Sequence, residues 1–310
     1  MVITLTLNSA VDKTYTVENF SLDRVHRPTV EKSVAGGKGI NVARVLHTLG
    51  REVLATGFVG GYNGGLIVSG LEGEGIAHDL VRTRGESRIC IAIVDPVNGT
   101  QTEVNENGVE VAPEEVEALH TKLGLLLGRA SHLVLCGSAP PGVPVDFYAR
   151  AIQSAKAAGV VAVLDSSGEH LRSGIAALPY MVKPNVAELS AYVGSELYTV
   201  EEILQAARRL TKMGIRLVVV SMGRAGALAM DGETAWQATP PEVDFVSAVG
   251  SGDALLAAFL DALVAGKDMP EALTAGTAAG AANAAVSGAG FCSAESIALL
   301  KPQVRLTRLP

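Results

Sequence analysis

Strand-length runs of apolar residues recur along the chain, and each is followed by a segment with helical periodicity. The runs are VITLTL, VLATGFVG, HLVLCG, VVAVLD and LVVVSMG. Continuous apolar strands that alternate with helices are typical of a parallel sheet lying between helices. Most runs end in Gly, Ser, Asp or Asn, so polar and flexible residues fall at the carboxyl edge, where such sheets bind ligands. The sequence therefore predicts an α/β protein with its functional site at that edge.

Two segments, at about 12–34 and 87–107, break this rhythm. They alternate apolar and polar residues around Asp-Pro and Asn-Gly turn signals, as strands of a small antiparallel sheet do. Because both are inserted into the α/β pattern, we expect them to pair as a discontinuous lid over the site; two ordinary surface hairpins are the alternative. No repeat or linker divides the chain, so a single domain over 1–310 is expected.

Charge and composition favour small-molecule chemistry. There are 25 Lys and Arg residues against 32 Asp and Glu residues, a net charge of −7, and no basic block suggests a nucleic-acid partner. The N-terminus lacks a signal-peptide pattern, and ALLAAFLDALVAG is too short for a membrane span, so we expect a cytoplasmic protein with no membrane partner. Three scattered cysteines, Cys90, Cys136 and Cys292, are expected to be reduced and to pack in the core.

The segment AVGSGDALLAAFLDALVAG gives the sharpest chemical signal. A turn of Gly250, Ser251 and Gly252 opens a helix, where unpaired N–H groups and the helix dipole stabilise a transferring phosphoryl group. Asp253 follows in the first turn, where the same dipole is expected to keep its carboxylate ionised and able to accept a proton from a hydroxyl. The alternative is that Asp253 only stabilises the start of the helix.

A second glycine turn, VAGGKGINVARVLHTLG, opens another predicted helix. Gly37 permits close approach of a ligand, and Lys38 and Asn41 offer charge and hydrogen bonds to a phosphate or a sugar. Gly39 rather than Ser or Thr follows the lysine, so this is not a Walker A loop, and no G-x-G-x-x-G occurs in the chain. P-loop enzymes and standard dinucleotide enzymes are thereby disfavoured.

Two further strand ends carry candidate groups. In MVKPNVAELS, Asn185 and Glu188 lie one helical turn apart and are able to orient a hydrated Mg²⁺ ion; a variant capping box is the alternative. In VVVSMGRAGAL, the residues Ser221, Gly223 and Gly226 suit a nucleotide lying against the backbone; a tight hairpin turn is the alternative.

Taken in order, eight motifs resemble those of the ribokinase-like carbohydrate kinases of the pfkB type, in the branch that acts on phosphorylated ketohexoses. They are TLNSAVDKTY, AGGKGINVARVL, TEVNENG, CGSAPPGVP, LDSSGEHL, VKPNVAELS, VSMGRAGAL and AVGSGDA. The resemblance implies a three-layer αβα sandwich with a mainly parallel sheet and a small β-sheet lid, through which such proteins often form homodimers. It also implies ATP as co-substrate and Mg²⁺ as cofactor.

The resemblance assigns roles to individual residues. Asp253 would be the base, the amides of residues 248–252 the anion hole, and Glu188 the group that faces Mg²⁺ through water. The residues that would contact ATP are Lys183, Asn185, Ser221, Gly223, Gly226, Gly252 and Asn283, the last beside the adenine. The residues that would hold the phosphosugar are Asp12, Gly37, Lys38, Asn41, Asn105, Arg88 and Ser138, the last two at its phosphate.

The substrate is harder to predict, because kinases of fructose 1-phosphate, tagatose 6-phosphate and fructose 6-phosphate share these motifs. AGGKGINVAR and TEVNENG resemble the fructose 1-phosphate enzymes, whereas VLATGFVGG, SRICIAIVD and VGSGD resemble the tagatose 6-phosphate enzymes. We expect fructose 1-phosphate, with the other two as alternatives. A regulator that binds sugar or nucleotide without catalysis is a different class, which would lack the base or the anion hole. Departures from the family pattern are Ser9 for Pro, Met222 for Leu and Ala254 for Ser.

Overall fold

The computed structural model describes residues 1–310, and its largest element is an eleven-stranded sheet. The strand order is β15-β14-β13-β12-β11-β10-β9-β1-β4-β5, with β6 paired to β4. Pairing is parallel from β5 to β12 and antiparallel from β12 to β15. The strands are β1 (Val2–Thr6), β4 (Val53–Gly60), β5 (Ala77–His78), β6 (Val81–Thr83), β9 (His132–Cys136), β10 (Val161–Asp165), β11 (Met181–Val182), β12 (Leu217–Ser221), β13 (Ala227–Met230), β14 (Ala235–Thr239) and β15 (Arg305–Leu309).

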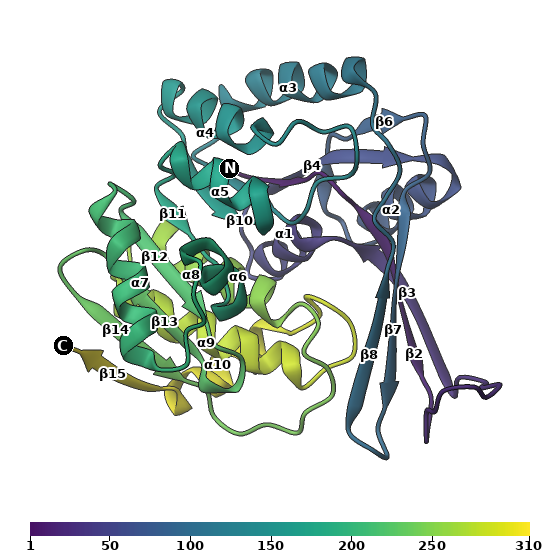
Figure 1. Cartoon of the computed structure of the whole chain (residues 1–310). Coiled ribbons are helices and arrows are strands. Elements are labelled where there is room, and N and C mark those ends of the chain that lie inside the picture. The colour runs from purple at the N-terminus through teal and green to yellow at the C-terminus, as the bar shows by residue number, and fades with distance from the viewer.

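Helices cover both faces of this main sheet (Figure 1). One face packs against α1 (Lys38–Thr48), α2 (Gly61–Gly73), α8 (Ser251–Val264), α9 (Met269–Ala284) and α10 (Ala294–Leu300). The other packs against α3 (Pro113–Leu127), α4 (Phe147–Ala157), α5 (Gly168–Ala176), α6 (Val186–Val193) and α7 (Val200–Lys212). Two short 3₁₀ turns, Gly223–Ala225 and Lys301–Gln303, complete the chain. The predicted three-layer αβα sandwich is confirmed.

The two faces explain the continuous apolar strands. Successive side chains of a strand point to opposite faces, so a strand covered on both sides needs apolar residues at every position. Accordingly, Val2 of β1 belongs to a cluster of 40 buried residues on one face, and Ile3 belongs to a cluster of 38 on the other. All eight residues of β4 are buried. The antiparallel edge formed by β13, β14 and β15 was not predicted.

A separate four-stranded sheet, here called the small sheet, extends from the body beside α2 (Figure 1). Its order is β3-β2-β7-β8, from β2 (Ala10–Thr16), β3 (Val30–Gly36), β7 (Arg88–Asp95) and β8 (Thr100–Asn105). Both hairpins are antiparallel, but β2 and β7 pair in parallel, so the expectation of a fully antiparallel sheet is wrong. The first strands of the two hairpins leave the body in the same direction, and pairing them joins the hairpins in parallel.

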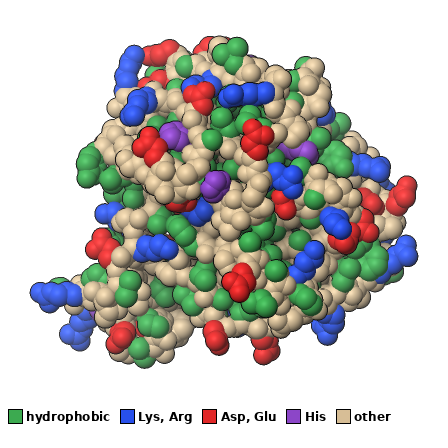
Figure 2. All heavy atoms as spheres, turned by 180° about the vertical axis from the view of Figure 1, so that it is seen from behind, with side chains coloured by type: hydrophobic (Ala, Val, Ile, Leu, Met, Phe, Trp, Pro, Cys, Tyr) green, Lys and Arg blue, Asp and Glu red, His purple; other side chains and the backbone are tan.

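The surface carries mixed charge. On the face shown in Figure 2, Lys and Arg side chains lie among Asp, Glu and hydrophobic side chains without gathering into one basic patch. None of the helices combines the length and the apolar character that a bilayer crossing requires. The cysteines form no disulfide; Cys136 and Cys292 are buried as expected, whereas Cys90 is only partly buried.

Candidate active site

A cavity of about 1160 Å³ lies between the carboxyl edge of the main sheet and the small sheet. Its walls come from the first turns of α1 and α8, the segments after β11, β12 and β14, and all four strands of the small sheet. Sites for one drug-sized ligand occupy roughly 300–1,000 Å³, so this cavity has room for two ligands side by side. Every predicted site residue lines it except Ser138 and Asn283.

The start of α8 forms one wall of the cavity. Gly250 caps the helix with a φ of 79°, and a Cβ at this position would lie 2.6 Å from the Cα of Ala289. Both the left-handed backbone and the contact exclude a larger residue. The helix begins at Ser251, so Gly252 and Asp253 both lie in its first turn, rather than Gly252 preceding the helix as predicted.

Only some of the predicted anion-hole amides are available. The N–H of Val249 donates to Ser247 Oγ at 3.2 Å, and the N–H of Ser251 donates to the Ala248 carbonyl at 3.1 Å. The N–H groups of Ala248, Gly250, Gly252 and Asp253 have no partner within the chain. Unpaired donors of a first helical turn attract anions, so three of the five predicted amides are available and Asp253 adds a fourth inside the helix.

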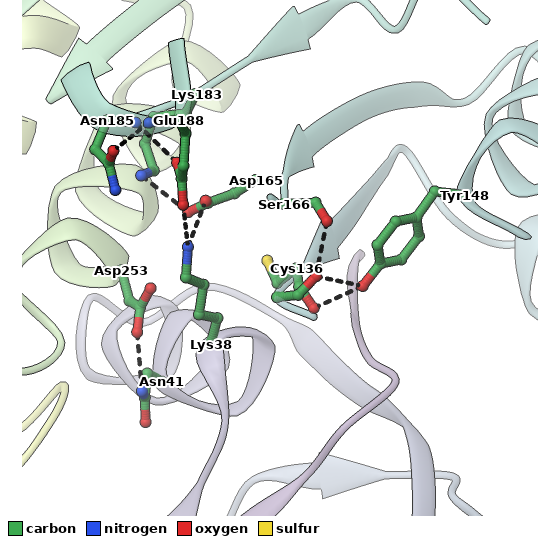
Figure 3. Close-up of polar contacts among 11 residues, drawn as sticks. Lys38, Asn41, Cys136, Tyr148, Asp165, Ser166, Lys183, Asn185, Glu188 and Asp253 are labelled. Carbon is green, nitrogen blue, oxygen red and sulfur yellow. Dashed lines mark hydrogen bonds and ion pairs between the residues drawn. The ribbon is translucent and has the colours of Figure 1, made fainter. Parts of the chain in front are cut away.

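Asp253 is buried at the cavity floor, with 6% of its surface exposed. Its Oδ2 accepts a hydrogen bond from Asn41 Nδ2 at 2.8 Å, while Oδ1 has no partner (Figure 3). Burial raises the pKa of Asp253 to about 6, against the opposing effects of Lys38 and of the Asn41 hydrogen bond. Burial therefore outweighs the helix dipole that was expected to set this pKa, and the carboxylate still ionises near neutral pH.

Lys38 and Lys183 meet at one carboxylate beside Asp253 (Figure 3). Lys38 Nζ lies 2.9 Å from Asp165 Oδ1 and 3.6 Å from Glu188 Oε1, and Lys183 Nζ lies 2.9 Å from Asp165 Oδ2. Burial lowers the pKa of Lys38, but the facing carboxylates outweigh it and raise the pKa above its usual value. Lys38 is therefore charged, and it lies beside Asp253, paired to two carboxylates.

Asp165 is a residue of the site that was not predicted from the sequence. It ends β10, has no exposed surface, and carries both lysines on its two oxygens. Burial raises its pKa, but Lys183 and Lys38 outweigh burial and hold the pKa below its usual value. The available signal was the rule that polar residues end the strands at the ligand-binding edge, applied to VVAVLD. Asp165 fixes the two ammonium groups at the cavity.

Asn185 and Glu188 form a capping box at the start of α6. Asn185 Oδ1 accepts from the Glu188 N–H, and Glu188 Oε2 accepts from the Asn185 N–H, both at 2.8 Å. The structural alternative for this pair is therefore present, yet both side chains also line the cavity. Glu188 Oε1 has only Lys38 near it, which leaves this oxygen able to accept from a water molecule.

The strand end at Ser221 opens the other half of the cavity. Gly223 begins a 3₁₀ turn that Gly226 caps, between the antiparallel strands β12 and β13, so the hairpin alternative is also present. A Cβ at Gly226 would lie 1.9 Å from the carbonyl oxygen of Ala238. Packing by itself therefore requires glycine here, whether or not a nucleotide binds. Phe245 also lines this half, with the Arg224 guanidinium 5.6 Å from its ring; neither residue was predicted.

The small sheet supplies Asp12, Arg88 and Asn105. Arg88 Nε donates to the Asn8 carbonyl at 3.1 Å and Nη1 donates to the Glu106 carbonyl at 2.9 Å, while Nη2 has no partner in the chain. Burial raises the pKa of Asp12 to about 6, opposed mainly by Arg88. Free guanidinium donors that face a cavity suit a phosphate.

Cys90 lies on the same small-sheet wall of the cavity, on β7. The prediction that it packs in the core is therefore wrong. Burial nevertheless raises the pKa of its thiol to about 11, so the sulfur stays protonated.

Two predicted ligand residues do not line the cavity. Asn283 has no exposed surface, and its side chain is fully engaged with the Val249 carbonyl, Ser251 Oγ and the Gly290 N–H. Its amide holds the turn before α8 and does not line the cavity, whereas the prediction placed it beside the adenine of ATP. Ser138 is exposed and its hydroxyl accepts from Asn8 Nδ2 at 3.3 Å; it does not line the cavity, whereas the prediction placed it at the phosphate of the sugar.

The chain matches known proteins over its whole length. The model of the pfkB family carbohydrate kinases matches residues 3–296. A 1-phosphofructokinase of Rhodobacter capsulatus is 37% identical over 310 residues, which cover 100% of this chain and 98% of the relative. A tagatose-6-phosphate kinase of Staphylococcus epidermidis is 35% identical over 287 residues, 92% of each chain. The crystal structure of phosphofructokinase-2 from Escherichia coli in complex with substrates and products superimposes with a TM-score of 0.91 at 31% identity, covering 97% of this chain and 98% of that one.

Proposed function

Because the chain belongs to the pfkB family of carbohydrate kinases, we propose that it transfers the γ-phosphoryl group of ATP to a ketohexose phosphate, preferably fructose 1-phosphate. The product would be fructose 1,6-bisphosphate, with ADP as the second product. The observation that carries this proposal is the arrangement around Asp253. One carboxylate oxygen is held by Asn41, the other is free, and unpaired amides of Gly250 and Gly252 stand beside it at the same cavity.

The free Oδ1 of Asp253 accepts the proton of the attacking hydroxyl. The hydroxyl oxygen of the sugar forms a bond to the γ-phosphorus as the bond between that phosphorus and the ADP oxygen breaks. One proton thus moves to the carboxylate, and one phosphoryl group moves to the sugar. A strong base is not required, because the attacking oxygen is only weakly bonded in a loose transition state. The N–H groups at the start of α8 and the ammonium of Lys183 stabilise the charge on the transferring group.

Mg²⁺ is the proposed cofactor, and the cavity fits an ion that takes most of its ligands from ATP and water. The structure holds no cluster of three or more His, Cys, Asp or Glu side chains suited to a metal. Mg²⁺ prefers few carboxylates and keeps several waters, which agrees with a single accessible oxygen on Glu188. When bound with ATP, the ion would neutralise phosphate charge, and Glu188 would hold one of its waters.

We assign recognition of the sugar to the small sheet and to α1. Arg88, with its free Nη2, is the proposed ligand of the phosphate that the sugar already carries, and Asp12 and Asn105 are the proposed partners of its hydroxyls. Each charge-assisted hydrogen bond to a phosphate contributes roughly 1.5–3 kcal/mol, which favours a phosphosugar over a neutral sugar. The small sheet would act as a lid that excludes water when both substrates are bound.

Tagatose 6-phosphate is the second candidate acceptor. It is favoured by the 35% identity to a tagatose-6-phosphate kinase, against 37% to a 1-phosphofructokinase, a small difference. Fructose 6-phosphate remains a third candidate. A regulator without catalysis is disfavoured, because the carboxylate and the unpaired amides needed for phosphoryl transfer are both in place.

An ADP-release assay with MgATP distinguishes these acceptors. Fructose 1-phosphate, tagatose 6-phosphate, fructose 6-phosphate, fructose and ribose would be compared under identical conditions. We expect at least about tenfold higher kcat/KM for fructose 1-phosphate, equivalent to about 1.4 kcal/mol of transition-state binding. Turnover of only the neutral sugars would overturn the phosphate role of Arg88, and no turnover of any acceptor would overturn the kinase assignment.

We further propose that the protein acts in the cytoplasm as a homodimer formed through the small sheet. Val30 and Val104, on its two outer strands, each expose 58% of their surface, which supports contact with a second small sheet. Light scattering of the purified protein, compared with a Val104→Lys variant, tests this. A dimer that the variant disrupts supports the proposal, and a wild-type monomer contradicts it.

A further inference from the structure

Arg44 is a buried arginine on α1 that carries no assigned role. Its side chain has 4% exposed surface and lies one helical turn beyond Asn41. It is flanked by Phe291, whose ring centroid lies 4.5 Å from the guanidinium carbon, and Lys32 Nζ approaches the same ring at 3.8 Å. A buried guanidinium is retained only where its hydrogen bonds compensate for lost hydration.

All five N–H donors of Arg44 are used. Nη1 donates to Asn41 Oδ1 at 3.0 Å and to the Ala289 carbonyl at 2.8 Å. Nη2 donates to the Ala35 carbonyl at 2.6 Å and to Glu74 Oε1 at 2.9 Å, and Nε donates to Glu74 Oε2. A guanidinium has five donors in a rigid fork, whereas a lysine ammonium has three on a point, so lysine cannot reproduce this pattern.

The bond to Asn41 decides which way that amide points. Arg44 is donor-only, so the group that faces it must be the amide oxygen Oδ1. This leaves the NH₂ group of Asn41 to face Asp253, whose ionised carboxylate is acceptor-only. Without Arg44, the amide is free to turn over and present its oxygen to Asp253, which favours a protonated carboxyl and disfavours the ionised base.

The same guanidinium connects the base to two other parts of the site. Ala35 is in β3 of the small sheet, next to Gly36, which packs directly against the Asp12 carboxylate. Ala289 is the residue against which Gly250 packs, so the carbonyl bonded to Arg44 belongs to the support of the anion hole. The Arg44 side chain therefore contacts Asn41, which is bonded to the base, Ala35 near the end of β3, and Ala289, which packs against the start of α8.

We propose that Arg44 is a positioning residue for phosphoryl transfer: it fixes the Asn41 amide so that this amide donates to Asp253 Oδ2 and leaves Oδ1 directed at the acceptor hydroxyl. Arg44 does not contact either substrate in this role. The inference rests on the proposed role of Asp253 as the base.

Other charged and titratable groups face this network and set the background of any pH measurement. Lys38 from α1, Asp165 at the end of β10, Lys183 after β11 and the Cys136 thiol at the end of β9 surround Asp253. Around Arg44 they are Glu74, Lys32 and Asp12. The Arg44→Lys variant keeps the charge among these groups, so that a change in pH dependence reports the hydrogen-bond pattern.

The test is the pH profile of kcat for Arg44→Lys beside the wild type. We expect a loss of about 10- to 30-fold in kcat at pH 8, with KM for the phosphosugar changed less, and an acid limb displaced upward by about half a pH unit or more. The ratio of wild-type to variant kcat is then larger at pH 6 than at pH 8.5. A lower kcat with an unmoved acid limb would show a merely structural role and overturn the inference.

Three further variants complete the test. Arg51→Lys is the matched control, because Arg51 pairs with Asp261 at the far half of α8 and should leave the acid limb in place. Glu74→Gln weakens the hold on the Arg44 guanidinium without changing a residue of the cavity. It should displace the acid limb in the same direction as Arg44→Lys but by a smaller amount. If Arg44→Lys does not fold, Glu74→Gln alone tests the positioning role. Asp253→Asn separates the two hypotheses: if it keeps normal turnover, the base assignment fails, whereas an inactive Asp253→Asn with an unmoved limb in the Arg44 and Glu74 variants overturns only the positioning role.

Discussion

No residue of β8 in the small sheet is buried, whereas every residue of β4 in the main sheet is. Both sheets supply side chains to the same cavity, but from different surroundings. Asp253, Asp165 and Lys183 are each at most 6% exposed and are held by ion pairs or hydrogen bonds from several elements. Arg88 instead projects from a sheet with one open face, held by two backbone carbonyls.

This difference separates two tasks. Groups that move protons and stabilise developing charge must be fixed before the reaction, which a close-packed body achieves. Groups that select the acceptor need only meet it when it binds, and a thin sheet that can change position suits that task. We therefore expect substitutions in the body to lower kcat and substitutions in the small sheet to alter KM and acceptor preference.

The largest expected effect follows from Asp253→Asn in the body. It keeps the shape of the side chain but removes proton acceptance, so kcat should fall by about 10³- to 10⁵-fold while ATP affinity changes little. Stopped assays of product formation and calorimetric titration with ATP measure the two quantities. Asp261→Asn, in the same helix but away from the cavity, should keep kcat within about twofold. Near-normal turnover of Asp253→Asn would contradict the assignment of the catalytic base to this part of the body.

A smaller but more selective effect is expected from Arg88→Gln in the small sheet. Loss of its charged donors should lower kcat/KM for the phosphosugar by about 10- to 100-fold, mainly through KM, because a charge-assisted bond is worth roughly 1.5–3 kcal/mol. Steady-state kinetics against the phosphosugar check this. Arg84→Gln, at an arginine with 82% exposure, is the matched control and should behave as the wild type. If kcat fell and KM did not, the division between the two regions would be wrong at this residue.

Acidification should affect both regions over the same range. Asp253 and Asp12 both have a pKa of about 6, raised by burial. Asp253 must be ionised to accept a proton, and ionised Asp12 accepts stronger hydrogen bonds than the protonated group. As pH falls through 6 each carboxylate becomes protonated, so kcat/KM should fall, and at pH 5 it should be at least about tenfold below its plateau. A profile of log kcat/KM from pH 5 to 9 gives the limb; a slope above one shows that both groups contribute. Full activity at pH 5 would contradict the assigned pKa values.

The smallest effect is expected at a contact between the small sheet and the body that involves no residue proposed to bind or react with the substrates. Ser247 Oγ donates to Gln101 Oε1 at 3.0 Å, which joins β8 to the segment before α8. Gln101→Ala should raise KM for the phosphosugar about two- to fivefold, because the closed arrangement loses one hydrogen bond of roughly 1 kcal/mol. Thermal unfolding should be almost unchanged, since the body keeps its packing. A large loss of kcat instead would mean that the small sheet takes part in fixing the base.

The sequence was more informative about the body than about the small sheet. Runs such as VLATGFVG predicted buried parallel strands because burial on both faces leaves a continuous apolar signature, and the glycine turns predicted the starts of α1 and α8. The parallel join between β2 and β7 left no such signature, since it depends on how two distant hairpins leave the body. Local alternation of residues predicts a strand but not its partner.

The sequence also predicted part of the site. Residues in glycine turns and strand ends, including Asp253, Lys38 and Arg88, reach the cavity. Asp165 was overlooked because a single aspartate after a strand is unremarkable until two lysines from distant segments are placed on it. Asn283 was expected beside ATP; in the structure its helix passes behind the anion hole, and its amide is bonded to the backbone there.

The division between the two regions is tested most directly by measuring kcat/KM for fructose 1-phosphate and for fructose with the wild type, Asp253→Asn and Arg88→Gln in one series. We predict that Asp253→Asn loses turnover of both sugars by similar factors, whereas Arg88→Gln loses about 10- to 100-fold with fructose 1-phosphate and changes little with fructose. Equal losses with both sugars in Arg88→Gln, or retained turnover in Asp253→Asn, would contradict the assignment of selection to the small sheet and of chemistry to the body.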